Sequence, residues 1–76
     1  MDLSQIQLNH KVVIDRLCML PEAIQQFIDL GLYIGARITP KKDYEDGRIY
    51  EMNGKWVVVK DAIAEMIIVA DPPEDL

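Results

Sequence analysis

The chain has 76 residues, half of them apolar, and a formal net charge of −5 at neutral pH. This length allows one small hydrophobic core, and the apolar content argues against intrinsic disorder. The negative charge argues against a protein that neutralises nucleic-acid phosphates or anionic lipid over a broad face. The single cysteine, Cys18, excludes an internal disulfide and indicates a reducing, intracellular compartment.

Charge is unevenly distributed along the chain. Six of the eight basic residues lie between positions 36 and 60, whereas the last sixteen residues carry five acids and no base. A solvated strand face followed by an acidic tail explains this asymmetry more simply than a dedicated anion site. No stretch approaches the roughly 20 apolar residues needed to cross a bilayer, and the acidic start of the chain is unlike a secretory signal. The sequence therefore predicts a cytoplasmic protein without direct membrane insertion.

The first half of the chain predicts a strand and a short helix. Asn9 marks a turn, because Asn tolerates the left-handed backbone conformation better than other non-glycine residues. The β-branched run from Val12 to Leu17 has the length and composition of a strand. Between Pro21 and Leu30, apolar residues recur at spacings of three and four, which indicates a helix with one apolar face. Gly31 can end this helix in the left-handed conformation.

A second strand is predicted after the helix. Residues 32–35 lead into residues 36–39, whose alternating apolar pattern indicates the strand, and Pro40 either ends this strand or confines it to a sheet edge. Residues 43–47 are then expected to form a polar loop, with a turn at Asp46-Gly47.

A hairpin and a closing strand complete the pattern. Arg48–Met52 and Lys55–Val59 are extended runs on either side of Asn53-Gly54. This dipeptide is typical of a type I′ hairpin turn, because that turn needs positive φ at both central residues. Residues 60–66 have helical propensity for barely two turns, and residues 67–69 form the closing strand.

These elements describe a mainly β domain. We expect a small, partly closed barrel of about five strands, with one short helix between strands 1 and 2 and a short helical turn before the last strand. Closure would hide strand edges that otherwise invite aggregation. Residues 1–70 are expected to form this single domain, and residues 71–76, with two prolines and three acids, a flexible acidic tail.

Three segments carry a family resemblance: Leu3-Ser4-x-Ile6, Leu30-Gly31-Leu32-x-x-Gly35-Ala36-x-Ile38 and Gly54-Lys55-Trp56-x-Val58-Val59-Lys60-x-x-x-Ala64-x-x-Ile67-x-Val69. In this order and at these spacings, which span nearly the whole chain, they are similar to ferrous iron transport protein A (FeoA), a family with an SH3-like domain. The matching glycines have structural reasons: Gly31 caps the helix, Gly35 lets the chain reverse, and Gly54 completes the hairpin with Asn53.

The resemblance implies a cytoplasmic, non-enzymatic domain of ferrous iron uptake. Its partner would be ferrous iron transport protein B, the membrane permease with a GTP-binding domain, whose iron uptake it would support or regulate. The fold is also similar to the C-terminal module of iron-dependent repressors, but no helix-turn-helix precedes it here, which disfavours DNA binding. Two other hypotheses stay open: a generic SH3-like adaptor that captures an extended or Pro-rich peptide between aromatic side chains, and an enzyme subunit or metal chaperone.

Catalytic and metal-binding patterns are absent from the sequence. His10, Cys18 and the four methionines do not fall at a ligand spacing such as Cys-x-x-Cys. The segment Asp43-x-Glu45-Asp46-Gly47 lacks the calcium-loop pattern. His10 and Cys18, eight residues apart, do not form a placed base and nucleophile, and there is no P-loop. We therefore predict no catalytic site, no tight metal site and no cofactor.

Large amphipathic side chains are the candidates for binding a partner. The predicted partner-binding residues are Tyr33, Tyr44, Tyr50 and Gln26. Trp56 is expected to pack on the hairpin instead. The predicted helix and the segment after it form a further candidate surface, although Ile24, Phe27 and Ile28 are expected to lie mostly in the core. Apolar residues left exposed there would also permit weak self-association.

Overall fold

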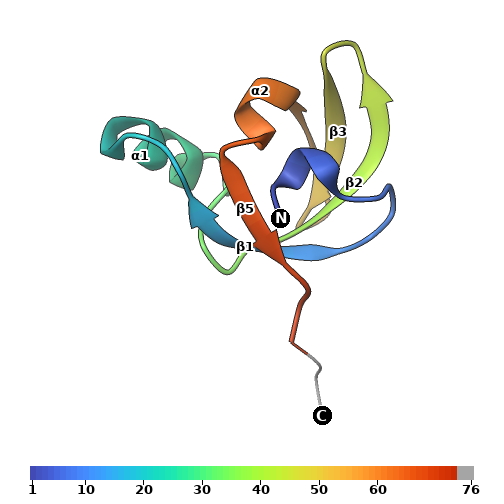
Figure 1. Ribbon diagram of the computed structural model, residues 1–76, viewed down its shortest axis with the longest axis horizontal. Helices are drawn as coiled ribbons and strands as arrows, with labels where there is room; N and C mark the ends of the chain where they lie inside the picture. The colour runs from blue at the N-terminus through green and yellow to red at the C-terminus, as the bar shows by residue number, and fades with distance from the viewer. Residues whose placement is uncertain (74–76) are drawn as a thin grey trace.

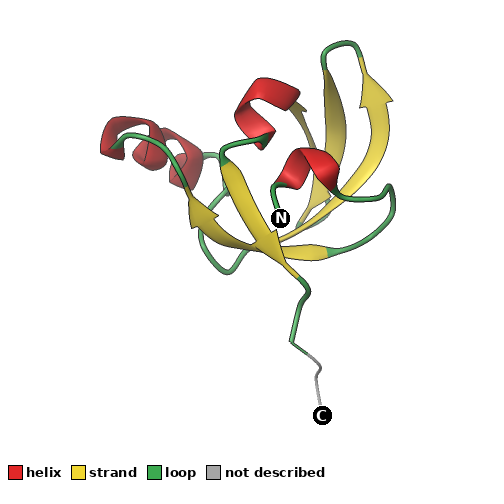
Figure 2. Ribbon diagram, in the orientation of Figure 1, coloured by secondary structure: helices red, strands yellow, loops and turns green. Residues whose placement is uncertain are grey.

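The computed structural model describes residues 1–73 and shows one curled antiparallel sheet with short helices at its margins (Figure 1, Figure 2). The strands are β1 (Val12–Leu17), β2 (Arg37–Tyr44), β3 (Gly47–Met52), β4 (Lys55–Lys60) and β5 (Ile67–Ala70). Their spatial order is β4-β3-β2-β1-β5, so the sheet does not close into a barrel. Helix α1 (Pro21–Asp29) follows β1, and helix α2 (Asp61–Ala64) precedes β5. The mainly β, SH3-like fold with these two helices is confirmed.

β2 runs further than the sequence predicts. A turn at Ile34-Gly35 precedes it, and the strand continues through Pro40 to Tyr44. The prediction that Pro40 ends the strand is wrong. β2 is the middle strand of the five, but β1 pairs with it at Arg37 and Ile38, so at Pro40 itself the strand pairs with β3 alone. The register between β2 and β3 shifts between Pro40 and Lys42. Such an irregularity tolerates a residue that has no N–H to donate.

Both hairpin turns are tight. The predicted loop over residues 43–47 is reduced to Glu45-Asp46, because Tyr44 and Gly47 already pair in the ladder. Glu45 takes a positive φ of 53° there. At the next turn, Asn53 and Gly54 have φ values of 52° and 78°, as the type I′ prediction requires.

The N-terminal residues form an element that the sequence pattern did not reveal. A 3-10 turn, η1, spans Leu3–Gln5. The Asp2 carboxylate caps it by accepting a hydrogen bond from the backbone N–H of Ser4 at 2.9 Å, and Leu3 is fully buried in the core. Asp2 also bridges to Ile68, so this segment lies along the outer edge of β5.

Arg48 ties the N-terminal segment to the β2–β3 hairpin. Its Nε donates a hydrogen bond to Asp43 Oδ1 at 3.0 Å, and a terminal guanidinium nitrogen donates to the backbone carbonyl of Ile6. The Arg48 side chain is mostly buried. A charge-assisted hydrogen bond in such a place is stronger than one between neutral groups.

We expect Arg48→Ala to lower the free energy of unfolding by about 1 to 3 kcal/mol, because the Ile6 carbonyl loses its charged donor. Lys41→Ala is the matched control, since it removes a 4.0 Å ion pair to Glu51. Such a partly exposed pair contributes less than about 1 kcal/mol. Urea unfolding of both variants measures the difference, and equal losses would contradict the anchoring role of Arg48.

Candidate partner-binding surface

α1 leaves much of its apolar surface uncovered. Ile24 and Phe27 pack against the core but remain partly exposed, and no residue of the helix is fully buried. Leu20, just before the helix, is 73% exposed, and Leu30, just after it, is 66% exposed. The expectation that Ile28 lies mostly in the core is wrong, because it is also exposed. The helix projects from the side of the sheet and does not lie across it (Figure 1).

The segment after α1 extends this surface. Leu32 is buried and anchors the segment, while Tyr33 and Ile34 are exposed. Gly31 and Gly35 have φ values of 90° and 95°, which residues with a side chain rarely adopt. These two glycines therefore let the chain reverse on either side of the exposed pair. We term the exposed apolar side chains of this region the α1 surface: Leu20, Ile28, Leu30, Tyr33 and Ile34.

A hollow of about 230 Å³ opens at the C-terminal end of α1. Ile28, Leu30 and Met52 supply apolar lining, and Asn53 of the β3–β4 turn also borders it. Asp29 and Lys55 give the hollow one charge of each sign. Interfaces are commonly anchored by an apolar side chain that fills a pocket of this kind.

The predicted partner-binding residues do not share one face. Gln26 is exposed on α1, and Tyr33 is exposed just after it. Tyr44 is exposed beside the β2–β3 turn, which lies on the other side of the molecule from α1 (Figure 1). The prediction that Tyr50 contacts a partner is wrong, because its side chain is fully buried on the inner face of β3. Trp56, which was expected to pack on the hairpin, is 63% exposed.

Tyr50 is the titratable group that the fold perturbs most clearly. Burial raises the pKa of Tyr50 to about 12, and the nearby positive charge of Arg48 opposes this shift only in part. The hydroxyl finds no hydrogen-bond partner among residues 1–73. An ionised Tyr50 would be a buried anion, so the folded protein favours the neutral phenol.

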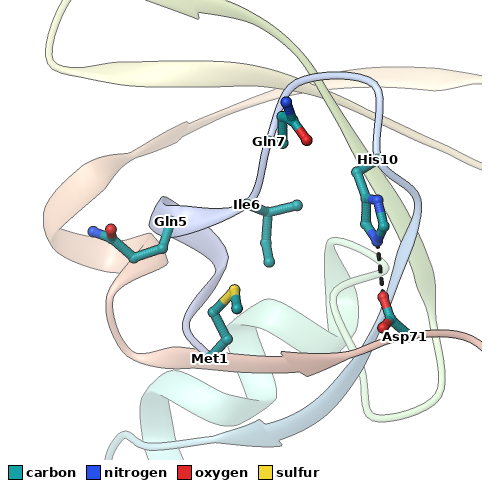
Figure 3. A pocket seen from close by; sticks show the side chains of 6 residues that line it. All are labelled: Met1, Gln5, Ile6, Gln7, His10 and Asp71. Atoms are coloured by element: carbon teal, nitrogen blue, oxygen red, sulfur yellow. Dashed lines mark hydrogen bonds and ion pairs between the residues drawn. The ribbon is translucent and has the colours of Figure 1, made fainter.

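A second hollow, of about 320 Å³, lies beside the N-terminal segment (Figure 3). The side chains of His10 and Asp71 point toward each other at its border, with 2.8 Å between Nε2 and Oδ1. Both side chains are largely exposed. Asp71 begins the predicted acidic tail. Residues 74–76 of that tail lie outside the described part of the chain, so its flexibility stays a prediction.

The described residues provide neither a metal-binding cluster nor a membrane-spanning helix. No three His, Cys, Asp or Glu side chains among residues 1–73 lie where they could hold one metal ion. None of the helices in this part of the chain has the length and apolar character to cross a membrane.

Known structures share this fold. The FeoA protein from Chlorobium tepidum superposes with a TM-score of 0.85 at 23% identity, over 100% of this chain and 74% of that one. An iron uptake regulatory protein (FeoA) gives a TM-score of 0.81 at 21% identity, over 91% and 93% of the two chains. IdeR from T. acidophilum gives 0.80 at 20% identity, over 95% of this chain but 34% of that one. No curated protein sequence matches the chain.

The family assignment comes from the sequence of nearly the whole described domain. At identities below 25%, the structural neighbours establish the SH3-like fold and no more. The model of the FeoA domain family, however, matches residues 1–71. This match confirms the resemblance carried by the glycine positions and the closing segment. The protein therefore belongs to the FeoA domain family, which is linked to ferrous iron uptake.

Proposed function

We propose that this chain is a non-enzymatic accessory protein of ferrous iron uptake, which binds the cytoplasmic GTP-binding region of the permease ferrous iron transport protein B through the α1 surface. Membership of the FeoA family supports the iron-uptake role. The observation that carries the binding role is the exposure of five large apolar side chains around α1. Scattered exposed apolar residues are normal, but a group beside a hollow is typical of an interaction site.

The non-enzymatic part of the proposal rests on where the reactive side chains lie. His10 precedes β1 and Cys18 follows it. The length of that strand separates them by about 20 Å, at 3.3 Å per residue. His10 instead faces Asp71 on an exposed surface. A base and a nucleophile need hydrogen-bond contact to work together, so any GTP chemistry would belong to the permease.

The adaptor alternative has less support. Capture of a Pro-rich peptide needs exposed aromatic side chains next to one another. Tyr44 lies level with Lys60 in the sheet, because both residues pair with Gly47 of β3. Trp56 lies four residues before Lys60 along β4. This offset is about 13 Å along the strand, so the two aromatics do not form one groove.

Calorimetric titration of the purified GTP-binding domain tests the proposal. We expect Leu30→Asp and Ile34→Asp each to weaken binding about tenfold or more, because a charge would be buried in an apolar contact. Tyr44→Ala is the matched control, since it changes an exposed side chain beside the β2–β3 turn. Circular dichroism and thermal unfolding verify that each variant is folded. No binding by the wild type at tens of micromolar, or equal affinity for all variants, would contradict the proposal.

A further inference from the structure

One edge of the sheet, along β4, is uncovered. β4 and β5 are the two outermost strands. The β5 edge is occupied by the N-terminal segment, because Asp2 bridges to Ile68 and the Val69 N–H donates to the Met1 carbonyl at 2.8 Å. Within residues 1–73, β4 pairs with β3 and with no other strand. The second side of β4 is therefore free to accept a strand.

The ladder between β3 and β4 determines which backbone groups face that free side. The Asp61 N–H donates to the Asp46 carbonyl at 2.9 Å, at the end of a register that is continuous along β4. Asp61 therefore faces β3 with its backbone groups. Hydrogen-bonded and non-hydrogen-bonded pairs alternate in an antiparallel ladder, so every second residue before it, at positions 59, 57 and 55, also directs its N–H and C=O groups toward β3. Trp56 and Val58 direct theirs outward. Between its two ends, the edge thus offers two donors and two acceptors at the spacing of an added strand.

The side chains on this edge are also uncovered. Trp56 is 63% exposed and Val58 is 56% exposed, and both lie on the outer face of the sheet. Exposed edges are usually blunted by proline, by a bulge or by a lysine within the strand. β4 has none of these between its ends, since its two lysines are the terminal residues Lys55 and Lys60. Neither lysine forms an ion pair with another residue of the described chain.

We propose that the β4 edge binds an extended segment of another protein, which joins the sheet as a sixth strand. The segment that fits has β-branched residues beside Trp56 and Val58 and a carboxylate at each end, opposite Lys55 and Lys60. A second copy of this chain fits less well, because it would bring two more lysines to the same edge. The inference rests on the sheet edge. Lys55 also borders the hollow beside α1, but the edge includes none of the α1 surface residues and the inference does not depend on the permease.

A synthetic peptide, acetyl-Glu-Val-Thr-Val-Thr-Glu-amide, is the probe. Trp56 is the single tryptophan of the chain, so strand addition should shift its fluorescence to shorter wavelength. Amide exchange at Trp56 and Val58 should slow in the complex. The same peptide with lysines at both ends should bind about tenfold more weakly or worse, because its charges repel Lys55 and Lys60. Failure of the wild type to bind at millimolar peptide, or protection on another strand, would overturn the proposal.

Val58→Pro separates backbone pairing from nonspecific attraction. It removes an outward N–H and no donor to β3, so the hairpin should persist while peptide affinity falls about tenfold or more. Unchanged affinity in the folded variant would overturn the proposal. The double variant K55E/K60E gives a second readout that does not depend on proline, because it should reverse the preference to the lysine-ended peptide. Ile34→Asp should bind the peptide like the wild type, which distinguishes this edge from the α1 surface.

Discussion

Gly47→Ala is expected to lower the free energy of unfolding by about 3 kcal/mol. A Cβ atom at position 47 would lie 2.4 Å from the carbonyl oxygen of Val59 and 2.8 Å from the Cα of Lys60. Both are backbone atoms of β4, so no side-chain rotation can relieve the contact. β3 and β4 would have to separate where the hairpin meets α2. Urea unfolding followed by circular dichroism measures the loss.

Gly54→Ala is the matched control for this effect. A Cβ at position 54 meets nothing within 4 Å, but its φ of 78° stays unfavourable for alanine. We expect this variant to lose only about 1 kcal/mol. If Gly47→Ala were no more destabilising than Gly54→Ala, the close approach of the two strands would not limit the residue at position 47.

Alkaline pH should destabilise the protein through Tyr50. Burial raises the pKa of Tyr50 from 10.0 to about 12 in the folded state, whereas the unfolded chain keeps the ordinary value. Between these two values the unfolded state has released the proton and the folded state has not, so the stability falls as the pH rises. The contribution is fully present below pH 10 and is lost toward pH 12. Its size is about 2 to 3 kcal/mol for a shift of about two pKa units.

Tyr50→Phe isolates this contribution. The two proteins share every other side chain, so the difference between the two pH profiles reports Tyr50 alone. Below pH 10 we expect the variant to be as stable as the wild type or up to about 1 kcal/mol more stable, because the buried hydroxyl lacks a partner within the described chain. Urea unfolding at intervals from pH 8 to pH 12 is the measurement. Parallel profiles would show that Tyr50 does not ionise in a buried site.

Some elements follow from local sequence alone. The Asn53-Gly54 turn needs positive φ at two adjacent residues, and few other dipeptides meet that need. The helix from Pro21 has a proline that suits its first turn and a glycine that suits its end. Asn9 adopts the predicted left-handed conformation, with a φ of 68°. In each case the constraint lies within a few neighbouring residues, so no tertiary contact is needed to predict it.

β2 shows where local rules fail. It pairs with β1 at Arg37 and Ile38 and with β3 from Thr39 onward. Proline has no N–H, so it is excluded from a central strand only where a neighbouring strand needs a donor at that position. Whether a neighbouring strand needs a donor at Pro40 depends on how β1, β2 and β3 are aligned with one another. That register is a property of the assembled sheet.

The binding surfaces depended still more on tertiary structure. β4 is apolar at positions 56–59, so its pattern does not say which side chains face the core. Pairing with β3 turns Val57 and Val59 inward with Tyr50, and leaves Trp56 and Val58 outside. Likewise, the apolar periodicity of α1 predicted the helix but not how much of it the sheet would cover. The turns and the helix could be predicted from the sequence because each depends on near neighbours, and the family could be recognised from residues matched along nearly the whole domain. Tertiary packing decided which apolar side chains remain exposed, because burial depends on which distant segments meet.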